Sequence, residues 1–333
     1  MNFHTTYSRI LGTLAVGVSL AMAPLAYAQT LRIASNFPSE HTASQAMTIF
    51  KDEVESATNG ELTINVFPDM QLGGASENVD QVRSGVVFAV VSSIAYYTRI
   101  VPEFEAVSLP FIFPTRDAAF RVMDGPVGDI FNDKMQDAGF VTLGYGELGF
   151  RHVTNNVRPI TSVDDFAGMK IRLQPNEVHL ATFRTLGANP VSMDVSELYS
   201  ALQQGVLDGQ ENPYNIIATR RFVEVQEHLS DTGHFFDFIN VVANKRQFER
   251  LSEEHQEAVR AAMKKAMDWQ RAEAARLDDS WREKLIAEGI TFTPISDTLR
   301  EELRSATASV ADLLKERIDP AIIDTVVAEA AKQ

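Results

Sequence analysis

The amino-acid sequence predicts an α/β protein of two lobes, each built on a mainly parallel sheet flanked by helices. Strand-like and helix-like segments alternate from residue 31 onward, and a strand-helix-strand order makes consecutive strands parallel. A second series of the same kind begins with the alternating segment 169–173. The chain has 333 residues, which exceeds the size at which a single hydrophobic core stops growing, so two domains are expected.

The first series alternates strands with amphipathic helices. Its expected order is strand, helix, strand, helix, strand, helix and strand over residues 31–34, 42–58, 62–66, 76–84, 86–91, 116–137 and 140–144. Asn59-Gly60 ends the first of these helices. The run 86–91 is continuously apolar, which is typical of a strand buried on both faces.

The second series opens with a strand that carries an arginine. Met169, Ile171 and Leu173 share one face of this strand, Arg172 projects from the other, and Pro175 ends it. Ligands bind beyond the carboxyl ends of parallel strands, where a guanidinium can hold a carboxylate by two parallel hydrogen bonds. Two interpretations of Arg172 stay open at this point, an anion clamp and an ordinary surface salt bridge.

Two further helices follow in the second half of the chain. Asp194 with Glu197 predicts a capping box for a helix that ends at Gly205. The stretch 252–288 contains neither proline nor glycine, and as one helix it would be about 55 Å long and would span both lobes. The alternative is two helices with a break near Asp278-Asp279.

The N-terminus predicts export. Arg9 precedes an apolar run over 10–25, and Ala-Tyr-Ala follows at 26–28, which is the pattern of a secretory signal peptide cleaved after Ala28. A membrane anchor is the competing interpretation, but the run is short for a bilayer span and carries Pro24. We therefore expect an exported, soluble mature protein that begins at Gln29.

The composition argues against several classes of function. The chain has no cysteine, which excludes disulfides, thiolate chemistry and cysteine metal sites. Its 45 acidic and 30 basic residues make nucleic acid an unexpected partner, although local arginines can still hold a small anion. The seven histidines lack metal-binding spacing, and no nucleophile elbow or P-loop occurs, so we expect neither a metal nor a cofactor.

The segment 144–149 matches the dinucleotide-binding pattern G-x-G-x-x-G. That pattern requires a helix to begin at once so that its N-terminus can hold the pyrophosphate, whereas residues 150–156 read as a strand or loop. The glycines are expected instead to let the backbone bend where the chain leaves one lobe. A spatially assembled pair of Glu147 and Glu211, working as acid and base, is the enzymatic alternative.

Several aromatic residues have two interpretations. Trp269 and Trp281 lie within the long helical stretch and are expected to pack. Phe235, Phe236 and Tyr214 follow polar loop segments, where they either wall a cleft or belong to the core.

Taken together, these features resemble the DctP-type solute receptors of tripartite ATP-independent periplasmic (TRAP) transporters. The most specific segments are K-I-R at 170–172 and L-Y-x-A-L-Q-x-G-V-x-D-G-Q-E-N-P at 198–213. Q-L-G-G at 71–74, F-R-H-V-T-N at 150–155 and the cleavable signal agree with them. The resemblance covers essentially the whole mature chain.

The resemblance implies a two-lobed periplasmic-binding-protein-like fold with a long helix spanning both lobes. The expected lobe I is 29–149 plus about 239–275, and the expected lobe II is 150–238 plus about 276–333. The implied function is a periplasmic, monomeric receptor, not an enzyme, that closes on a small organic acid and delivers it to the membrane subunits of a TRAP transporter. The alternatives are a receptor that serves a chemosensory or ABC-type partner and a periplasmic enzyme that uses carboxylates.

The resemblance also assigns ligand-binding roles. Arg172 is the expected carboxylate clamp, aided by Arg151 of the G-x-R-x-x-T segment, while Asn212 belongs to the D-G-Q-E-N-P segment and Asn36 matches an asparagine of sialic-acid receptors. The complete expected set of ligand-binding residues is Arg172, Arg151, Asn212, Asn36, Ser93, Tyr214, Asn176 and Phe236.

Departures from the sialic-acid receptors bear on the ligand. The chain has Ala75 and Ser93 where those receptors have acidic contacts, and Val195 where they have a stacking phenylalanine. Their asparagine after the clamp falls on Pro175 or, with a slip of one residue, on Asn176. Sialic acid is therefore disfavoured, and the expected ligand is a smaller sugar acid such as a hexuronate or aldonate. A C4 dicarboxylate or a 2-keto acid is the alternative.

Overall fold

The computed structural model describes Met1 and residues 28–332. The predicted signal segment lies almost entirely outside the described residues, so its cleavage after Ala28 stays a prediction. A single mixed sheet of nine strands runs through the molecule in the order β2-β1-β3-β8-β4-β7-β5-β6, with β9 paired to β8. Among the described residues, no helix combines the length and the apolar character needed to cross a membrane.

The strands divide the molecule into two lobes. The strands are β1 (Gln29–Ser35), β2 (Leu62–Phe67), β3 (Ala89–Ser93), β4 (Phe140–Asn155), β5 (Lys170–Leu173), β6 (Asn189–Ser192), β7 (Gly209–Asn212), β8 (His228–Asn244) and β9 (Thr291–Thr293). Lobe I carries the parallel set β2-β1-β3, and lobe II carries the parallel set β6-β5-β7. The long strands β4 and β8 pair antiparallel and run from one lobe into the other. The predicted two-lobed α/β architecture is confirmed.

Helices cover both faces of this sheet. The α-helices are α1 (Thr42–Ala57), α2 (Ala75–Ser84), α3 (Arg116–Met123), α4 (Pro126–Asp137), α5 (Glu177–Thr185), α6 (Val195–Gln203), α7 (Tyr214–Thr219), α8 (Lys245–Phe248), α9 (Glu253–Ala287), α10 (Asp297–Ala306), α11 (Val310–Lys315) and α12 (Pro320–Ala330). Short 3₁₀ helices are η1 (Ile94–Tyr97), η2 (Pro102–Ser108), η3 (Val163–Phe166) and η4 (Phe222–Glu224). The single helix expected over 116–137 is two helices, because Gly125 and Pro126 form the start of α4.

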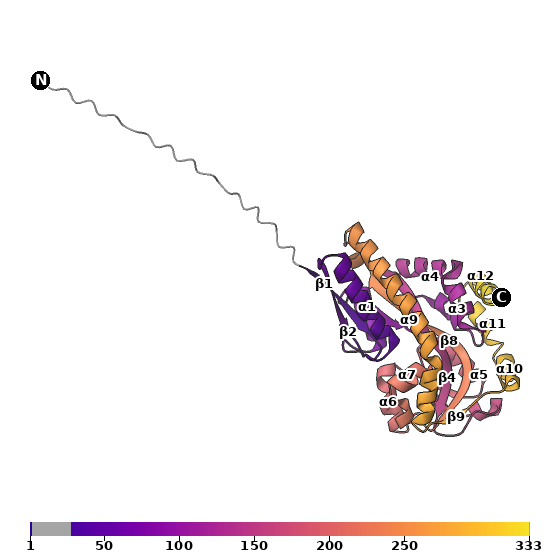
Figure 1. Cartoon of the computed structure of the whole chain (residues 1–333). Helices are drawn as coiled ribbons and strands as arrows, with labels where there is room; N and C mark the ends of the chain where they lie inside the picture. The colour runs from indigo at the N-terminus through magenta and orange to yellow at the C-terminus, as the bar shows by residue number, and fades with distance from the viewer. Residues whose placement is uncertain (2–27, 333) are drawn as a thin grey trace.

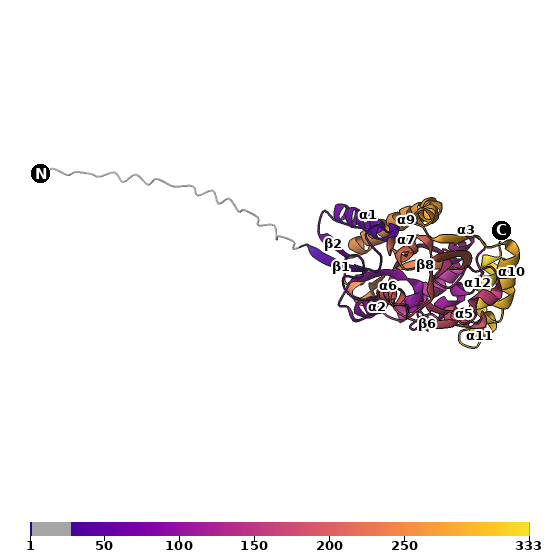
Figure 2. The ribbon, with the colours of Figure 1, turned by 90° about the horizontal axis from the view of Figure 1, so that it is seen from below.

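Side-chain alternation along β8 explains why a hydrophobic core lies on each face of the sheet. Val241 and Ala243 belong to the core beneath α1 and α9, whereas Val242 belongs to the core beneath α2 and α4. Figure 2 shows α1 and α9 side by side on the same side of the molecule, and the two helices pack against each other. In lobe II, Met169, Ile171 and Leu173 share one core cluster, as their alternation predicts.

The long helix α9 is continuous. It runs without interruption for 35 residues through Asp278-Asp279, so the two-helix alternative is wrong. It packs on α1 of lobe I, on β4 and on α7 of lobe II (Figure 1). A single rigid element therefore bridges the two lobes on one face of the sheet. Trp269 and Trp281 pack against the adjoining core, as expected.

The glycine-rich segment 144–149 lies within the uninterrupted strand β4. A Cβ atom at Gly146 would lie 2.6 Å from Gln270 Oε1 on α9, so this glycine permits close approach of helix and strand. Gln270 accepts a hydrogen bond from Glu147 N at 2.8 Å and donates one to Thr42 of α1 at 3.0 Å. The expected bend takes the form of β-bulges, one of which lies at Gly149 with φ of +117°.

The C-terminal helices are shared between the lobes. Helix α10 packs on η3 of lobe II, whereas α12 packs on α3, α4 and η2, which lie in the expected lobe I. The lobe boundaries stay a prediction, and α12 does not follow the expected placement of the whole segment 276–333 in lobe II.

Candidate ligand-binding site

Arg172 is a fully buried cation with an incomplete set of partners. Its side chain has 0% exposure, its Nε donates to Met193 O at 2.8 Å, and its Nη2 donates to Tyr96 Oη at 3.2 Å. Its Nη1 is buried without a hydrogen-bond partner, and no carboxylate of the described residues lies within ion-pair distance of the guanidinium. Arg172 is therefore not a surface salt bridge, because it is neither exposed nor paired.

Arg172 lines a small cavity of about 20 Å³ between the lobes. Lobe I contributes the residues at the carboxyl ends of β1 and β3, and lobe II contributes those at the ends of β5 and β7 together with α7. The lining residues are Asn36, Phe37, Ser93, Tyr96, Leu148, Arg172, Gln174, Val195, Asn212, Ile216 and Arg220. Carboxyl ends of parallel strands are where open α/β sheets bind ligands, so the cavity lies where the strand order predicts it.

Three polar side-chain atoms around this cavity are buried without a partner. They are Arg172 Nη1, Asn36 Nδ2 and Gln174 Oε1. Buried polar groups in folded proteins are nearly always hydrogen-bonded, and an unpaired one costs about 1–3 kcal/mol. A polar, anionic molecule in the cavity would supply the missing partners.

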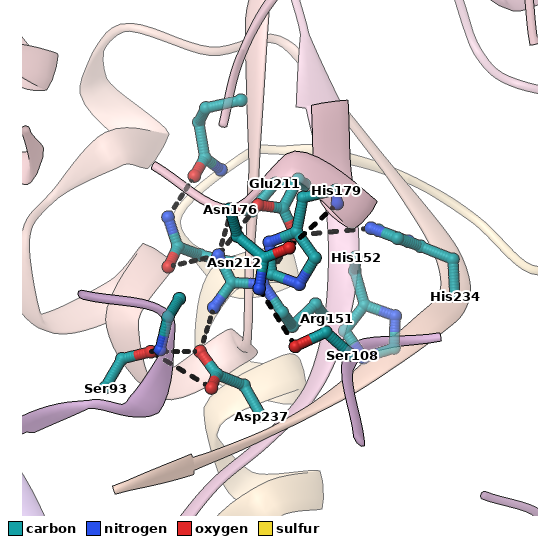
Figure 3. A network of polar contacts seen from close by, with 12 residues as sticks. Ser93, Ser108, Arg151, His152, Asn176, His179, Glu211, Asn212, His234 and Asp237 are labelled. Atoms are coloured by element: carbon teal, nitrogen blue, oxygen red, sulfur yellow. Dashed lines mark hydrogen bonds and ion pairs between the residues drawn. The ribbon is translucent and has the colours of Figure 1, made fainter. Parts of the chain in front are cut away.

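Arg151 lies behind the cavity in a network of ion pairs (Figure 3). Its Nε and Nη2 donate to the two carboxylate oxygens of Glu211 at 2.5 and 2.8 Å, and its Nη1 donates to Asp237 Oδ2 at 2.9 Å. A further bond joins Nη2 to Asn212 Oδ1 at 3.1 Å. Internal acceptors thus engage every nitrogen of Arg151, and the side chain does not line the cavity. Its expected role as a second carboxylate clamp stays a prediction.

The two carboxyl groups beside Arg151 have different protonation tendencies. Burial opposes ionisation of Glu211, but Arg151 and a hydrogen bond from His234 hold its pKa well below the ordinary range. Burial raises the pKa of Asp237 even though Arg151 and Ser93 favour its charged form. Burial also lowers the pKa of His234, so this imidazole is neutral and donates through Nε2 to Glu211 at 3.2 Å. The Arg151 guanidinium therefore pairs with two different carboxyl groups. Glu211 has a lowered pKa and is ionised, whereas the raised pKa of Asp237 disfavours its ionised form.

Four of the expected site residues come together. Arg172, Asn36, Ser93 and Asn212 all line the cavity. Ser93 and Asn212 also connect it to the network behind, since Ser93 Oγ donates to Asp237 at 2.8 Å and Asn212 Nδ2 donates to Gln210 at 2.5 Å.

Three of the expected residues lie outside the lining of this cavity, and their ligand-binding role stays a prediction. Tyr214 donates to Asp231 at 2.8 Å and stacks on His152 in a separate pocket. Asn176 caps α5 and donates to Ser108 at 3.0 Å (Figure 3). Phe236 packs among other phenylalanines of the core, so core packing is the correct interpretation of this ring.

Glu147 and Glu211 do not form the acid-base pair of the enzymatic alternative. Glu147 pairs with Arg116 at 3.2 Å, whereas Glu211 pairs with Arg151, and neither carboxylate lines the cavity. Burial raises the pKa of Glu147 to about 7 against the opposing effect of Arg116.

Sequence reasoning missed three polar residues of the cavity. Gln174 carries a usable signal, because residues two apart in an extended segment share a face and Arg172 lies two positions earlier. Tyr96 lies in η1 just beyond β3. Arg220 lies at the end of α7, and no pattern predicts that its Nη2 donates to Asn36 O in lobe I at 2.5 Å or that Nη1 lies 3.6 Å from Asp69.

A carboxylate also joins the lobes beside the cavity. Asp194 is the N-cap of α6, where it accepts from Ser196 N at 3.1 Å. The same carboxylate accepts from Ser76 N at 3.0 Å and from Ala75 N at 3.3 Å, in the first turn of α2 in lobe I. These backbone N–H groups outweigh burial and hold the pKa of Asp194 below its ordinary value. The two lobes are thus in direct contact beside the cleft.

Comparisons with known proteins show the family to which this chain belongs. The model of the bacterial extracellular solute-binding protein family 7, DctP, matches residues 33–317. The 2,3-diketo-L-gulonate-binding periplasmic protein YiaO of Escherichia coli is 34% identical over 80% of this chain and 80% of its own length. The C4-dicarboxylate-binding periplasmic protein DctP of Rhodobacter capsulatus is 30% identical over 97% of this chain and 99% of its own length.

A solved structure shows the same fold. The sugar acid binding protein DctPAm of Advenella mimigardefordensis, in complex with galactonate, superposes with a TM-score of 0.89 at 29% sequence identity. The match covers 91% of this chain and 98% of that chain.

Proposed function

Because this chain belongs to the DctP family of TRAP periplasmic solute-binding proteins, we propose that it captures a sugar acid by pairing the acid's carboxylate with Arg172. The observation that supports this most directly is the state of that arginine. Its guanidinium is buried between the lobes, lacks a carboxylate partner among the described residues and keeps an unpaired Nη1. A buried cation of this kind is stabilised by an anionic ligand that accepts two parallel hydrogen bonds.

The composition of the cavity wall favours a hydroxylated acid such as an aldonate or hexuronate. Amide and hydroxyl groups supply most of the polar lining, and no carboxylate side chain of residues 28–332 belongs to it. One structural neighbour holds galactonate, which is consistent with this class. A C4 dicarboxylate or a 2-keto acid is the second candidate, which Arg220 favours because a second guanidinium lines the same cavity.

Contacts across the cleft couple capture to closure. Arg172 of lobe II binds Tyr96 of lobe I, and Arg220 binds the backbone of Asn36, so both arginines meet lobe I only when the lobes are together. A ligand that bonds to both lobes has a higher affinity for the closed form and shifts the population toward it. We further propose that the closed, exported receptor delivers its acid unchanged to the membrane subunits of a TRAP transporter.

The test is calorimetry on Arg172→Ala with D-galactonate, D-glucuronate, succinate and pyruvate as probes. Truncation leaves the ligand carboxylate buried without its cation, which costs about 3–5 kcal/mol and weakens binding at least hundredfold. The matched control is Arg184→Ala, because Arg184 is a half-exposed arginine of neighbouring α5 that pairs with Glu177 outside the cavity. Unchanged affinity of Arg172→Ala for an acid that the wild-type protein binds would overturn the proposal.

A further inference from the structure

We infer that Gln174 is a specificity-determining residue, which selects acids that carry a hydroxyl group over acids that do not. Gln174 follows the clamp strand β5 directly, and it shares a face with Arg172 because side chains two apart in an extended segment point the same way. Its side chain is 3% exposed and lines the same cavity. The inference rests on the proposed capture of an organic acid and adds the chemical feature by which that acid is chosen.

The unpaired atoms of the cavity differ in chemical type. Arg172 Nη1 and Asn36 Nδ2 are hydrogen-bond donors, whereas Gln174 Oε1 is an acceptor. A carboxylate satisfies the two donors but has no hydrogen to offer the acceptor at neutral pH.

The other polar groups around the cavity are already engaged as acceptors. Asn212 Oδ1 accepts from Arg151, and Asn36 Oδ1 accepts from Asn78 Nδ2 at 2.9 Å. Ser93 Oγ accepts from Ala95 N at 3.1 Å. Among the described residues that line the cavity, Gln174 therefore has the buried carbonyl oxygen that still lacks a donor.

A ligand hydroxyl supplies that donor. An acid without a hydroxyl leaves Gln174 Oε1 buried and unpaired, at a cost that corresponds to roughly tenfold to hundredfold in affinity. Sites that hydrogen-bond a substrate hydroxyl discriminate strongly against the analogue that lacks it, for this same reason. The preference is for a hydroxyl within reach of the Gln174 amide when the carboxylate is on Arg172.

The experiment measures dissociation constants for two matched pairs of probes, malate with succinate and D-galactonate with its 2-deoxy analogue, each of which differs by one hydroxyl. In the wild-type protein we expect the member of a bound pair with the additional hydroxyl to bind roughly tenfold or more tightly. In Gln174→Met, which keeps the length of the side chain and removes the acceptor, we expect this ratio to fall toward one without loss of affinity for the member that lacks this hydroxyl. Gln203→Met, at an exposed position of α6, is the control and keeps the wild-type ratio.

The outcomes separate this inference from the proposed function. Equal affinity of the wild-type protein for both members of each pair, or an equal loss for both in Gln174→Met, overturns the role of Gln174 and leaves the Arg172 clamp in place. A wild-type protein that binds none of the acids overturns the clamp and the inference together. The ratio of the two dissociation constants measured for the wild-type protein tests the inference even if the Gln174→Met variant folds poorly.

Discussion

Arg151 and Arg172 show how two fully buried arginines can serve opposite purposes. Arg151 is enclosed by Glu211 and Asp237, so its charge is balanced within the protein. Arg172 has a backbone carbonyl and a phenol as partners and keeps one N–H group unpaired. The first arrangement stabilises the fold without a ligand, whereas the second leaves an N–H group to which the proposed anionic ligand would bond.

Substitution of each arginine by methionine should separate these roles. Arg151→Met leaves two buried carboxyl groups without their cation, and we expect the free energy of unfolding to fall by about 3–5 kcal/mol. Arg172→Met should leave the ligand-free stability nearly unchanged while abolishing the rise in melting temperature that a bound acid produces. Urea unfolding and thermal shift with galactonate measure both effects. Equal destabilisation by the two variants would contradict the distinction.

The candidate site shows which residues a sequence can predict. Alternation and a strand-ending proline place Arg172 at the cleft, and the same alternation applies to Gln174. The partners of Arg151 were not predictable from its motif, because they come from β7 and β8, far away in the chain. Arg220 belongs to the cavity through a contact between lobes, which no local pattern encodes.

At the scale of elements, one carboxylate caps two helices. Asp194 accepts from the first turns of α6 in lobe II and α2 in lobe I. A Cβ atom at Gly74, the N-cap of α2, would lie 3.3 Å from Asp194 Cγ, so a residue without a side chain lets the two helix ends approach. The partial positive charges at both helix N-termini favour the ionised carboxylate.

Asp194→Ala should weaken ligand binding beyond its effect on stability. Loss of a cap costs about 0.5–2 kcal/mol, and the bonds to α2 exist only with the lobes together, so we expect affinity for a bound acid to fall roughly tenfold. Asp319→Ala is the matched control, because Asp319 caps only its own helix α12 through Ala321 N. Calorimetry should show unchanged affinity for the control. A similar loss of affinity in both variants would argue against a closure-specific role.

The elements themselves were largely predictable, and the exceptions have physical causes. The helix expected over 116–137 is interrupted at Gly125-Pro126, a signal present in the sequence. Strand β4 extends to Asn155, well past the glycine-rich segment at which its strand pattern ends. Pairing with β7 and β8 holds those residues extended, and both partners lie far away in the chain.

At the scale of the whole molecule, each lobe contains a buried neutral histidine. Burial lowers the pKa of His41 in lobe I and of His179 in lobe II to about 3. His41 stacks on Phe37, and His179 stacks on Phe235 at 4.1 Å. The unfolded chain takes up protons at these residues near pH 6.5, whereas the folded protein does not.

Acid should therefore destabilise the protein below about pH 6.5. As the pH falls from 6.5 toward 3, each histidine lowers the free energy of unfolding by up to about 1.4 kcal/mol per pH unit. Glu147 acts in the opposite direction between about pH 4.5 and 7, because its raised pKa favours the folded state as it takes up a proton. Burial also lowers the pKa of His234, which adds to the effect of His41 and His179, and raises the pKa of Asp237, which adds to that of Glu147. Three histidines against two carboxyl groups give a net loss on acidification.

Urea unfolding of the wild-type protein and of His179→Phe at pH 7.5, 6.5, 5.5 and 4.5 measures this effect. Phenylalanine keeps a ring against Phe235 and removes the titrating group, so the variant should lose less stability per pH unit. An identical slope for the two proteins would show that His179 does not contribute.

The order in which strands meet has a consequence for biosynthesis. Strand β3 pairs with the end of β8, and α1 packs against α9, so lobe I lacks its closing strand and its covering helix until most of the chain has been made. The N-terminal third cannot complete a core while it is still being translated. The polypeptide is predicted to carry a secretion signal. Such late completion keeps the nascent chain unfolded, so that it can pass through a translocation pore before it folds.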